Sequence, residues 1–259
     1  MRSFKNIVNI YPKIINNKVD NDVQEMLYPL DFMQCLIFIS KYHIRNNLIA
    51  PIGVITTFIS MIATMAFVVV HIYQTLFATS ETNSIASITT ENITRYFSCV
   101  FYCSVFTINF IMCVIQTNKS IKFVLTYQKV HRFLKNSGSY SYNNNYIIWN
   151  WVFVITAVIW HTSTIVYCVV SIGYNFFVAT CYMYPIMLFD INMVYAMRII
   201  KLLENEINIW NDVIKSRLHT QDENYCRDLL NIYVEILECY EIFKDCFQQS
   251  VSISTNRLD

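Results

Sequence analysis

Residues 136–189 read NSGSYSYNNNYIIWNWVFVITAVIWHTSTIVYCVVSIGYNFFVATCYMYPIMLF, and none of these 54 positions is Lys, Arg, Asp or Glu. Two further charge-free runs occupy residues 46–80 (35 positions) and 96–118 (23 positions). The other 147 positions hold all 37 charged residues, a share of about 25% that is ordinary for water-soluble chains. A single soluble globule is therefore excluded, and we predict an integral membrane protein with an all-α fold.

The charge-free runs are long enough for four membrane-spanning helices. A span needs about 20 mostly apolar residues, because backbone groups in hydrocarbon can bond only within a helix or a closed barrel. The longest run splits at a turn-like patch around Gly173. Pro185 should kink the last helix and leave the Cys181 carbonyl without its helical partner. The predicted spans are residues 48–77, 96–117, 147–171 and 176–197.

Lys and Arg in the flanking segments predict the orientation, because cytosolic loops are enriched in these residues. Three segments carry six, five and seven of them, whereas the two alternating segments carry one and none. The basic segments are residues 1–47, 118–146 and 198–259, and the others are residues 78–95 and 172–175. Both termini are therefore expected in the cytosol of a cell-membrane protein. Asn92 begins a glycosylation sequon on the predicted outer side.

Polar and small residues recur at helical spacing along the first three spans. Such stripes are typical of helix-packing seams, and the alternative is a ligand pocket or a water-lined cavity between the helices. His161 fits either a ligand contact or a hydrogen-bonded packing residue. The candidate ligand-binding residues in the predicted outer half are Tyr102, Trp160, His161, Thr164 and Tyr182.

Asp190 is the one formal charge within a predicted span. An uncompensated charge near mid-membrane costs about 3 kcal/mol or more, so a polar partner is expected. Asp190 is a candidate either for a polar clamp between helices or for a gating residue. Counting from the centre of each span separates it from His161 by about 9 Å in depth, which predicts no direct pair.

The C-terminal tail is predicted to be helical, because residues 186–259 contain no Gly and no Pro. The fourth helix should continue to about residue 215, and Thr220 to Glu223 fit a capping box that starts another helix. That helix needs a partner, either the preceding helix folded back or a neighbouring subunit. Its predicted seam is Leu229, Tyr233, Ile236, Tyr240, Phe243 and Phe247.

Three groups of residues resemble insect gustatory receptors, in particular the bitter-type members of moths and butterflies. The likeness covers nearly the whole chain through loose motifs. The first group precedes the first predicted span and consists of Met26 to Leu30 with Phe32 to Cys35, Lys41-Tyr42 and Ile44-Arg45. The second group is Asp190 to Asn192, Tyr195-Ala196, Arg198 and Trp210-Asn211, and the third is Leu229-Leu230, Tyr233, Ile236-Leu237, Tyr240-Glu241 and Phe243-Lys244.

The resemblance implies a subunit of a ligand-gated cation channel that detects small-molecule tastants in the lipid bilayer. Members of the family are seven-span proteins with a cytosolic N-terminus that assemble as tetramers, so a homo- or hetero-oligomer is expected. Their pore helix carries a Thr-Tyr to Gln-Phe signature that this chain lacks. The chain matches only the first four spans, either as a truncated product or as a natural short form. Alone, it should give no tastant-evoked current.

Several other classes of protein fit the sequence less well. A G-protein-coupled receptor would need an external N-terminus, which the charge pattern opposes. A four-span scaffold, or a transporter-like protein without channel activity that uses Pro185 and Asp190 as a broken-helix site, remains the alternative. Recognisable enzyme and metal motifs are absent from the sequence, so no enzyme activity, metal or cofactor is expected. A net charge of +1 gives no indication of nucleic acid.

Overall fold

The structure is a computed structural model that describes residues 17–45, 47–80, 90–137, 144–171, 173, 175–217 and 223–255. It is mostly helical, with one small hairpin of strands near the N-terminus. The helices are α2 (Asn21–Leu36), α3 (Val54–Ser80), α4 (Thr90–Asn136), α5 (Asn144–Ser171), α6 (Phe176–Arg217) and α7 (Glu223–Thr255). The strands are β1 (Tyr42–Arg45) and β2 (Leu48–Pro51).

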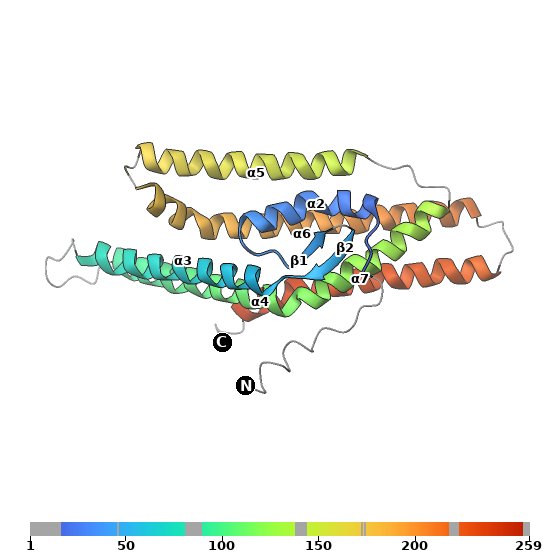
Figure 1. Cartoon of the computed structure of the whole chain (residues 1–259), viewed down its shortest axis with the longest axis horizontal. Helices are drawn as coiled ribbons and strands as arrows, with labels where there is room; N and C mark the ends of the chain where they lie inside the picture. The colour runs from blue at the N-terminus through green and yellow to red at the C-terminus, as the bar shows by residue number, and fades with distance from the viewer. Residues whose placement is uncertain are drawn as a thin grey trace, which may run out of the picture.

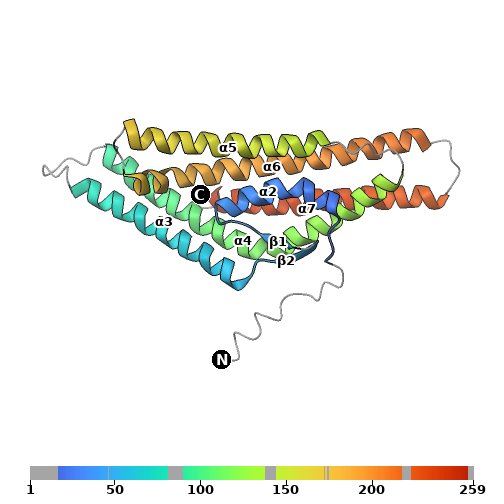
Figure 2. The same ribbon diagram turned by 45° about the horizontal axis from the view of Figure 1, so that its top comes forward.

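The helices form an elongated bundle (Figure 1). At one end lie α3, α5 and the first halves of α4 and α6, and at the other lie α7 and the second halves of α4 and α6. The shorter α2 runs along the middle, where it packs on α5 and α6 (Figure 2). Among the described helices, α4 and α6 are the two that extend from one end to the other.

Three helices of the described residues are long and apolar enough to cross a membrane: Val54–Leu76, Ile93–Asn136 and Asn145–Ser171. Within the most apolar 18-residue stretch of each helix, only 6%, 22% and 17% is buried inside the protein, respectively. Val54 and Ile55, for example, are 84% and 78% exposed. Side chains of this kind are stable against lipid rather than water, so the finding agrees with a membrane protein. The fourth predicted span, the first half of α6, stays a prediction.

The predicted basic loop 118–146 is for the most part helix, which corrects that boundary. Helix α4 continues without a break from the second predicted span to Asn136. The sequence of α4 contains neither Gly nor Pro, so nothing local stops the helix where its apolar run ends. The same reasoning had been applied to the fourth helix, and there it was right: α6 extends to Arg217, close to the expected residue 215.

The mostly helical structure agrees with the all-α prediction except at one small strand pair, β1–β2. The strands are antiparallel, with Tyr42 opposite Pro51 and Arg45 opposite Leu48. Asn47 lies in the turn with a φ of 61°, a left-handed conformation that Asn tolerates better than most residues. The hairpin occupies residues that had been assigned to the end of the N-terminal segment and the start of the first span, so α3 begins only at Val54.

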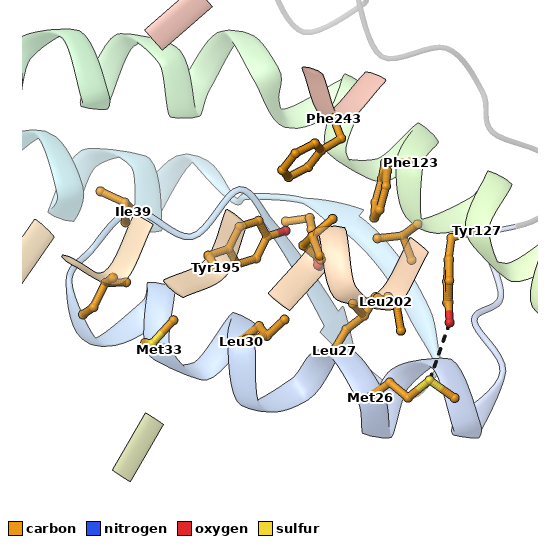
Figure 3. Close-up of a cluster of buried hydrophobic side chains, with 14 of the residues drawn as sticks. Met26, Leu27, Leu30, Met33, Ile39, Phe123, Tyr127, Tyr195, Leu202 and Phe243 are labelled. Atoms are coloured by element: carbon orange, nitrogen blue, oxygen red, sulfur yellow. Dashed lines mark hydrogen bonds between the residues drawn. The ribbon is translucent and has the colours of Figure 1, made fainter. Parts of the chain in front are cut away.

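The main hydrophobic core lies at the middle of the bundle (Figure 3). Leu27, Leu30 and Met33 of α2 are fully buried, and Leu202 of α6, which is 1% exposed, lies beside them. Ile199 of α6, also 1% exposed, belongs to the same cluster. Side chains from α4 and α7 close the core from the other side. A second buried cluster joins the far ends of α4, α6 and α7. It contains Val130, Leu134, Val213, Leu229, Ile232 and Ile236.

The predicted seam of α7 is right at Leu229, Ile236 and Phe243 and wrong at Tyr233 and Tyr240, where the buried residue lies one position earlier. Tyr240 is 49% exposed, and Tyr233 is half-buried and stacks on Trp210. The predicted frame followed the large aromatic residues, whereas small cysteines, which behave as buried apolar groups, lie in the true seam. The side chain of Phe247 lies outside the described part. The buried positions are Leu229, Ile232, Ile236, Cys239, Phe243 and Cys246.

The partner of α7 was also only partly foreseen. Helix α7 packs on α6, which is the preceding helix, but it packs more extensively on the extended half of α4. Ion pairs reinforce the α4–α7 contact on its exposed side: Lys119–Asp245 at 3.0 Å, Lys122–Glu238 at 2.6 Å and Lys129–Glu235 at 3.3 Å. The remaining cations of that half of α4 pair with α2 and the residue before it: Arg132 with Asp20 at 2.9 Å, and Lys135 with Asp22. All five cations of residues 118–146 are therefore in ion pairs.

Candidate functional site

His161 and Asp190 form a direct pair between α5 and α6, contrary to the sequence prediction. His161 Nε2 lies 3.6 Å from Asp190 Oδ2, and the side chains are 7% and 45% exposed. The predicted separation in depth assumed that each side chain lies level with its own Cα atom. In a helix the Cα–Cβ bond tilts toward the N-terminus. Because α5 and α6 are antiparallel neighbours, His161 tilts away from their connecting turn and Asp190 tilts toward it, which closes the offset.

A second polar contact joins α3 to α6 next to Pro185. His71 is buried, and its Nε2 lies 3.2 Å from the backbone oxygen of Cys181. That carbonyl is the one that Pro185 cannot bond, as the sequence predicted. Because a carbonyl only accepts, the contact requires the tautomer with its proton on Nε2. The imidazole of α3 therefore replaces the missing helical donor of α6, and it links the two helices where α6 is weakest.

The predicted ligand-binding residues do not converge on one cavity. Tyr102 lies on the α3 side, with its ring 5.8 Å from that of His71. Trp160 is 66% exposed, and the hydroxyl of Thr164 donates to the Trp160 carbonyl within α5. The side chains of Tyr182 and of Asn92, the glycosylation candidate, lie outside the described part. Among the predicted residues whose side chains the structure describes, His161 is the one with a polar contact to another helix.

A fully buried polar cluster joins α4 to α6 beyond the predicted spans. The hydroxyl of Tyr127 donates to Glu206 Oε1 at 2.7 Å, and His131 Nδ1 lies 3.1 Å from the same oxygen. Glu206 and Tyr127 are 0% exposed and His131 is 1% exposed. The hydroxyl of Tyr127 also lies 3.6 Å from the sulfur of Met26 in α2 (Figure 3). A buried carboxylate is stable only when it is hydrogen-bonded, so this cluster fixes how α4 and α6 are placed.

Sequence reasoning missed this cluster because residues 118–146 had been assigned to a loop. Tyr127 and His131 are four residues apart, a spacing that places both on one face of a helix. Glu206 stands on the apolar stripe of α6 between Leu202 and Ile209, where an acid needs a partner. Reading α4 through to Asn136 would have exposed both signals.

A third polar group links α2, α5 and α6 at the predicted inner ends of the spans. Arg198 Nε donates to Asn150 Oδ1 at 2.6 Å, and Asn150 Nδ2 donates to the Met26 carbonyl at 2.9 Å. The Tyr146 hydroxyl donates to the Arg198 carbonyl at 2.6 Å, and the guanidinium lies 4.6 Å from the Tyr146 ring centroid. Arg198 thus ties α6 to the start of α5, and Asn150 connects both to α2.

The end of α2 reaches the level of the predicted spans. The Tyr184 hydroxyl of α6 donates to the Ile37 carbonyl at 2.6 Å, and the Cys113 thiol of α4 donates to the Ile39 carbonyl at 3.4 Å. These bonds tie the segment that follows α2 to both α4 and α6. Within α2, burial raises the pKa of Asp31 to about 7, and its hydrogen bond with Tyr42 offsets part of the rise.

Two cavities lie near the start of α2, away from the predicted outer halves of the spans. One, of about 370 Å³, is lined by Tyr28, Trp151 and residues around them, and the other, of about 420 Å³, by His131, Arg132 and polar neighbours. A smaller cavity of about 40 Å³ between α3 and α4 is large enough for a few waters, and Thr57, Ser60 and Thr117 line part of it. No group of three or more His, Cys, Asp or Glu in the described ranges is arranged to hold a metal ion.

Comparisons with protein-family models, with characterised proteins and with solved structures give no match to this chain.

Proposed function

We propose that the chain is a membrane-embedded chemoreceptor subunit of the gustatory-receptor type, with four spans and both termini in the cytosol of the cell. The observation that carries the proposal is the continuity of α4 and α6, which have 47 and 42 residues. At 1.5 Å per residue these helices are about 70 Å and 63 Å long, more than twice the hydrocarbon thickness. Each one would connect a membrane region to a cytosolic bundle without a joint.

This continuity suits a signalling subunit. Ligand binding between the spans would shift α4 or α6, and the shift would reach the cytosolic end because a helix transmits displacement along its axis. The Tyr127–Glu206–His131 cluster and α7 hold the two helices together there. In this proposal the tastant site lies among the outer halves of the spans, and the assembled receptor is an oligomer, a tetramer by the family resemblance.

The fourth span is proposed from the first half of α6. Phe176, Phe177 and Phe189 are 66%, 60% and 63% exposed, which resembles the outward faces of α3 and α5. Helix α6 also packs beside α5 along this half (Figures 1 and 2). The positive charges of residues 118–146 favour a cytosolic position for the extended half of α4, even though each is also in an ion pair.

The transporter-like alternative depends on the broken helix at Pro185. In such a site the freed carbonyl coordinates an ion or a substrate. Here His71 Nε2 already contacts the freed Cys181 carbonyl. This contact favours a structural use of Pro185 and weakens the alternative.

The proposal is tested by topology and by ligand binding together. In a cysteine-free chain, single cysteines at Ser84 and Ser216 should react with an impermeant maleimide from the outer and the cytosolic side of the cell, respectively. Reaction of both from one side would overturn the four-span topology. In nanodiscs, caffeine, quinine and sucrose are the probes, and at least one should bind saturably. Binding should weaken about tenfold or more in Tyr102→Ala but not in Tyr73→Ala, whose residue is 57% exposed. Absence of saturable binding by all three would count against the receptor assignment.

A further inference from the structure

The outward face of α6 around Asp190 carries a charge in apolar surroundings. The side chain of Asp190 is 45% exposed although His161 lies 3.6 Å away. Three neighbours share its face of the helix by their spacing of four, three and seven residues. They are Ile186, Met193 and Met197, which are 41%, 48% and 51% exposed. This surface, the Asp190 face, is an apolar stripe with one carboxylate in it.

Such a face is costly against lipid, and this step rests on the proposed fourth span. Asp190 lies seven residues before the predicted inner end of that span, about 10 Å into the hydrocarbon at the helical rise. A charged carboxylate at that depth is unfavourable without a polar or charged partner. His161 is 7% exposed and contacts one carboxylate oxygen from inside the bundle, so the outward side of Asp190 would still face acyl chains. A partner on that side would remove the cost.

We propose that the Asp190 face binds a transmembrane helix of another polypeptide that presents a Lys or Arg to Asp190. Opposite charge is the complement that a half-exposed carboxylate in hydrocarbon requires. Met193 and Met197 suit a docking surface, because their unbranched side chains adapt to the shape of a partner. The partner is therefore defined by its chemistry: an apolar helix with one cation at the depth of Asp190.

A second copy of this chain does not supply that complement. Residues 46–80, 96–118 and 136–189 contain no Lys and no Arg. The two histidines within the spans, His71 and His161, are 5% exposed and face the interior contacts described above. A second copy would therefore bring uncharged spans or another Asp190 to this face. Two carboxylates opposite each other would raise the cost rather than remove it.

The test uses the full chain in phosphatidylcholine vesicles, with a donor fluorophore at its N-terminus. Two acceptor-labelled transmembrane peptides of Leu and Ala are titrated, one with a Lys at the depth of Asp190 and one with Leu at that position. Energy transfer should show the Lys peptide binding about tenfold more tightly. Asp190→Asn and Asp190→Leu should abolish the difference, whereas Glu204→Gln, an acid on the same helix outside the predicted span, should preserve it. Equal binding of both peptides, or a preference that survives Asp190→Leu, would overturn the proposal.

A separate measurement distinguishes failure of the docking site from failure of the fourth span. A cysteine-free chain with Asp190→Cys is treated with an impermeant maleimide on both sides of the membrane, and Ser216→Cys serves as the accessible reference. Reaction at position 190 as fast as at 216 would remove the span, and the docking site with it. Protection at 190 combined with equal binding of the two peptides would overturn the docking site alone.

Discussion

The two ends of the molecule use apolar side chains in opposite ways. The end that contains α3 and α5, here called the apolar end, exposes its apolar side chains: Val54 and Ile55 of α3 have 84% and 78% of their surface exposed. At the middle and far end, Leu30 of α2 and Ile199 of α6 are 0% and 1% exposed. Burial drives folding only where the alternative is water, and in lipid an outward apolar side chain has no such drive. The apolar end must therefore be held by polar contacts and packing, and the far end by its core.

Removing the buried acid of the far end should have the largest effect on stability. Glu206→Ala takes the shared acceptor away from Tyr127 and His131, which would remain buried. The free energy of unfolding should fall by about 3–5 kcal/mol, as for other broken buried pairs. Unfolding by SDS titration in bicelles measures it. The matched control is Glu204→Ala, an acid 52% exposed on the same helix, which should change stability by less than about 0.5 kcal/mol.

The same Ile→Ala substitution, made once in the core and once on the apolar outer surface of α3, compares what the two sites contribute to stability. Ile199→Ala should lower the free energy of unfolding by about 2–5 kcal/mol, because it removes buried methylenes and leaves a cavity. Ile55→Ala, at 78% exposure, should change it by less than about 0.5 kcal/mol. The same titration measures both. Equal losses would show that residue 55 is covered by protein in the membrane, and the contrast between the two ends would fail.

Between the two ends, Asp31 should make stability depend on pH. Burial raises its pKa from 3.8 to about 7, so the folded protein holds the proton more tightly than the unfolded chain does. The contribution of Asp31 is therefore fully present below about pH 4 and is lost as the pH rises to 7. Asp31→Asn should flatten this part of the profile and stabilise the protein at pH 8. Asp22→Asn, whose residue pairs with Lys135 at the surface, serves as the control and should not stabilise the protein at pH 8, because it removes an ion pair.

The difference between the ends also explains what could be predicted from the sequence. Absence of charge over 20 or more residues is a local signal, so the apolar parts of α3, α4 and α5 were predicted from composition alone. Contacts between helices are not local. The pair His161–Asp190 depends on the direction in which two side chains tilt, and the cluster at Glu206 depends on α4 continuing past the end of its apolar run. The contact of His71 with the Cys181 carbonyl was predictable in part. Pro185 indicated from the sequence that this carbonyl needs another hydrogen-bond donor, but the sequence did not indicate which helix supplies it.

The smallest effect is expected from the ion pairs along α4 and α7. Lys122 and Glu238 lie 2.6 Å apart, but their side chains are 62% and 39% exposed. Exposed pairs contribute about 0.2–1 kcal/mol, so Lys122→Ala should cost no more than that at low salt. At about 1 M salt the screening length is about 3 Å, and the cost should nearly vanish. A loss that persists at high salt would show that Lys122 acts through packing of its aliphatic stem. Because the five pairs of residues 118–146 are mostly of this exposed kind, the buried seam of α7 should hold it on α4, while the charges set its register.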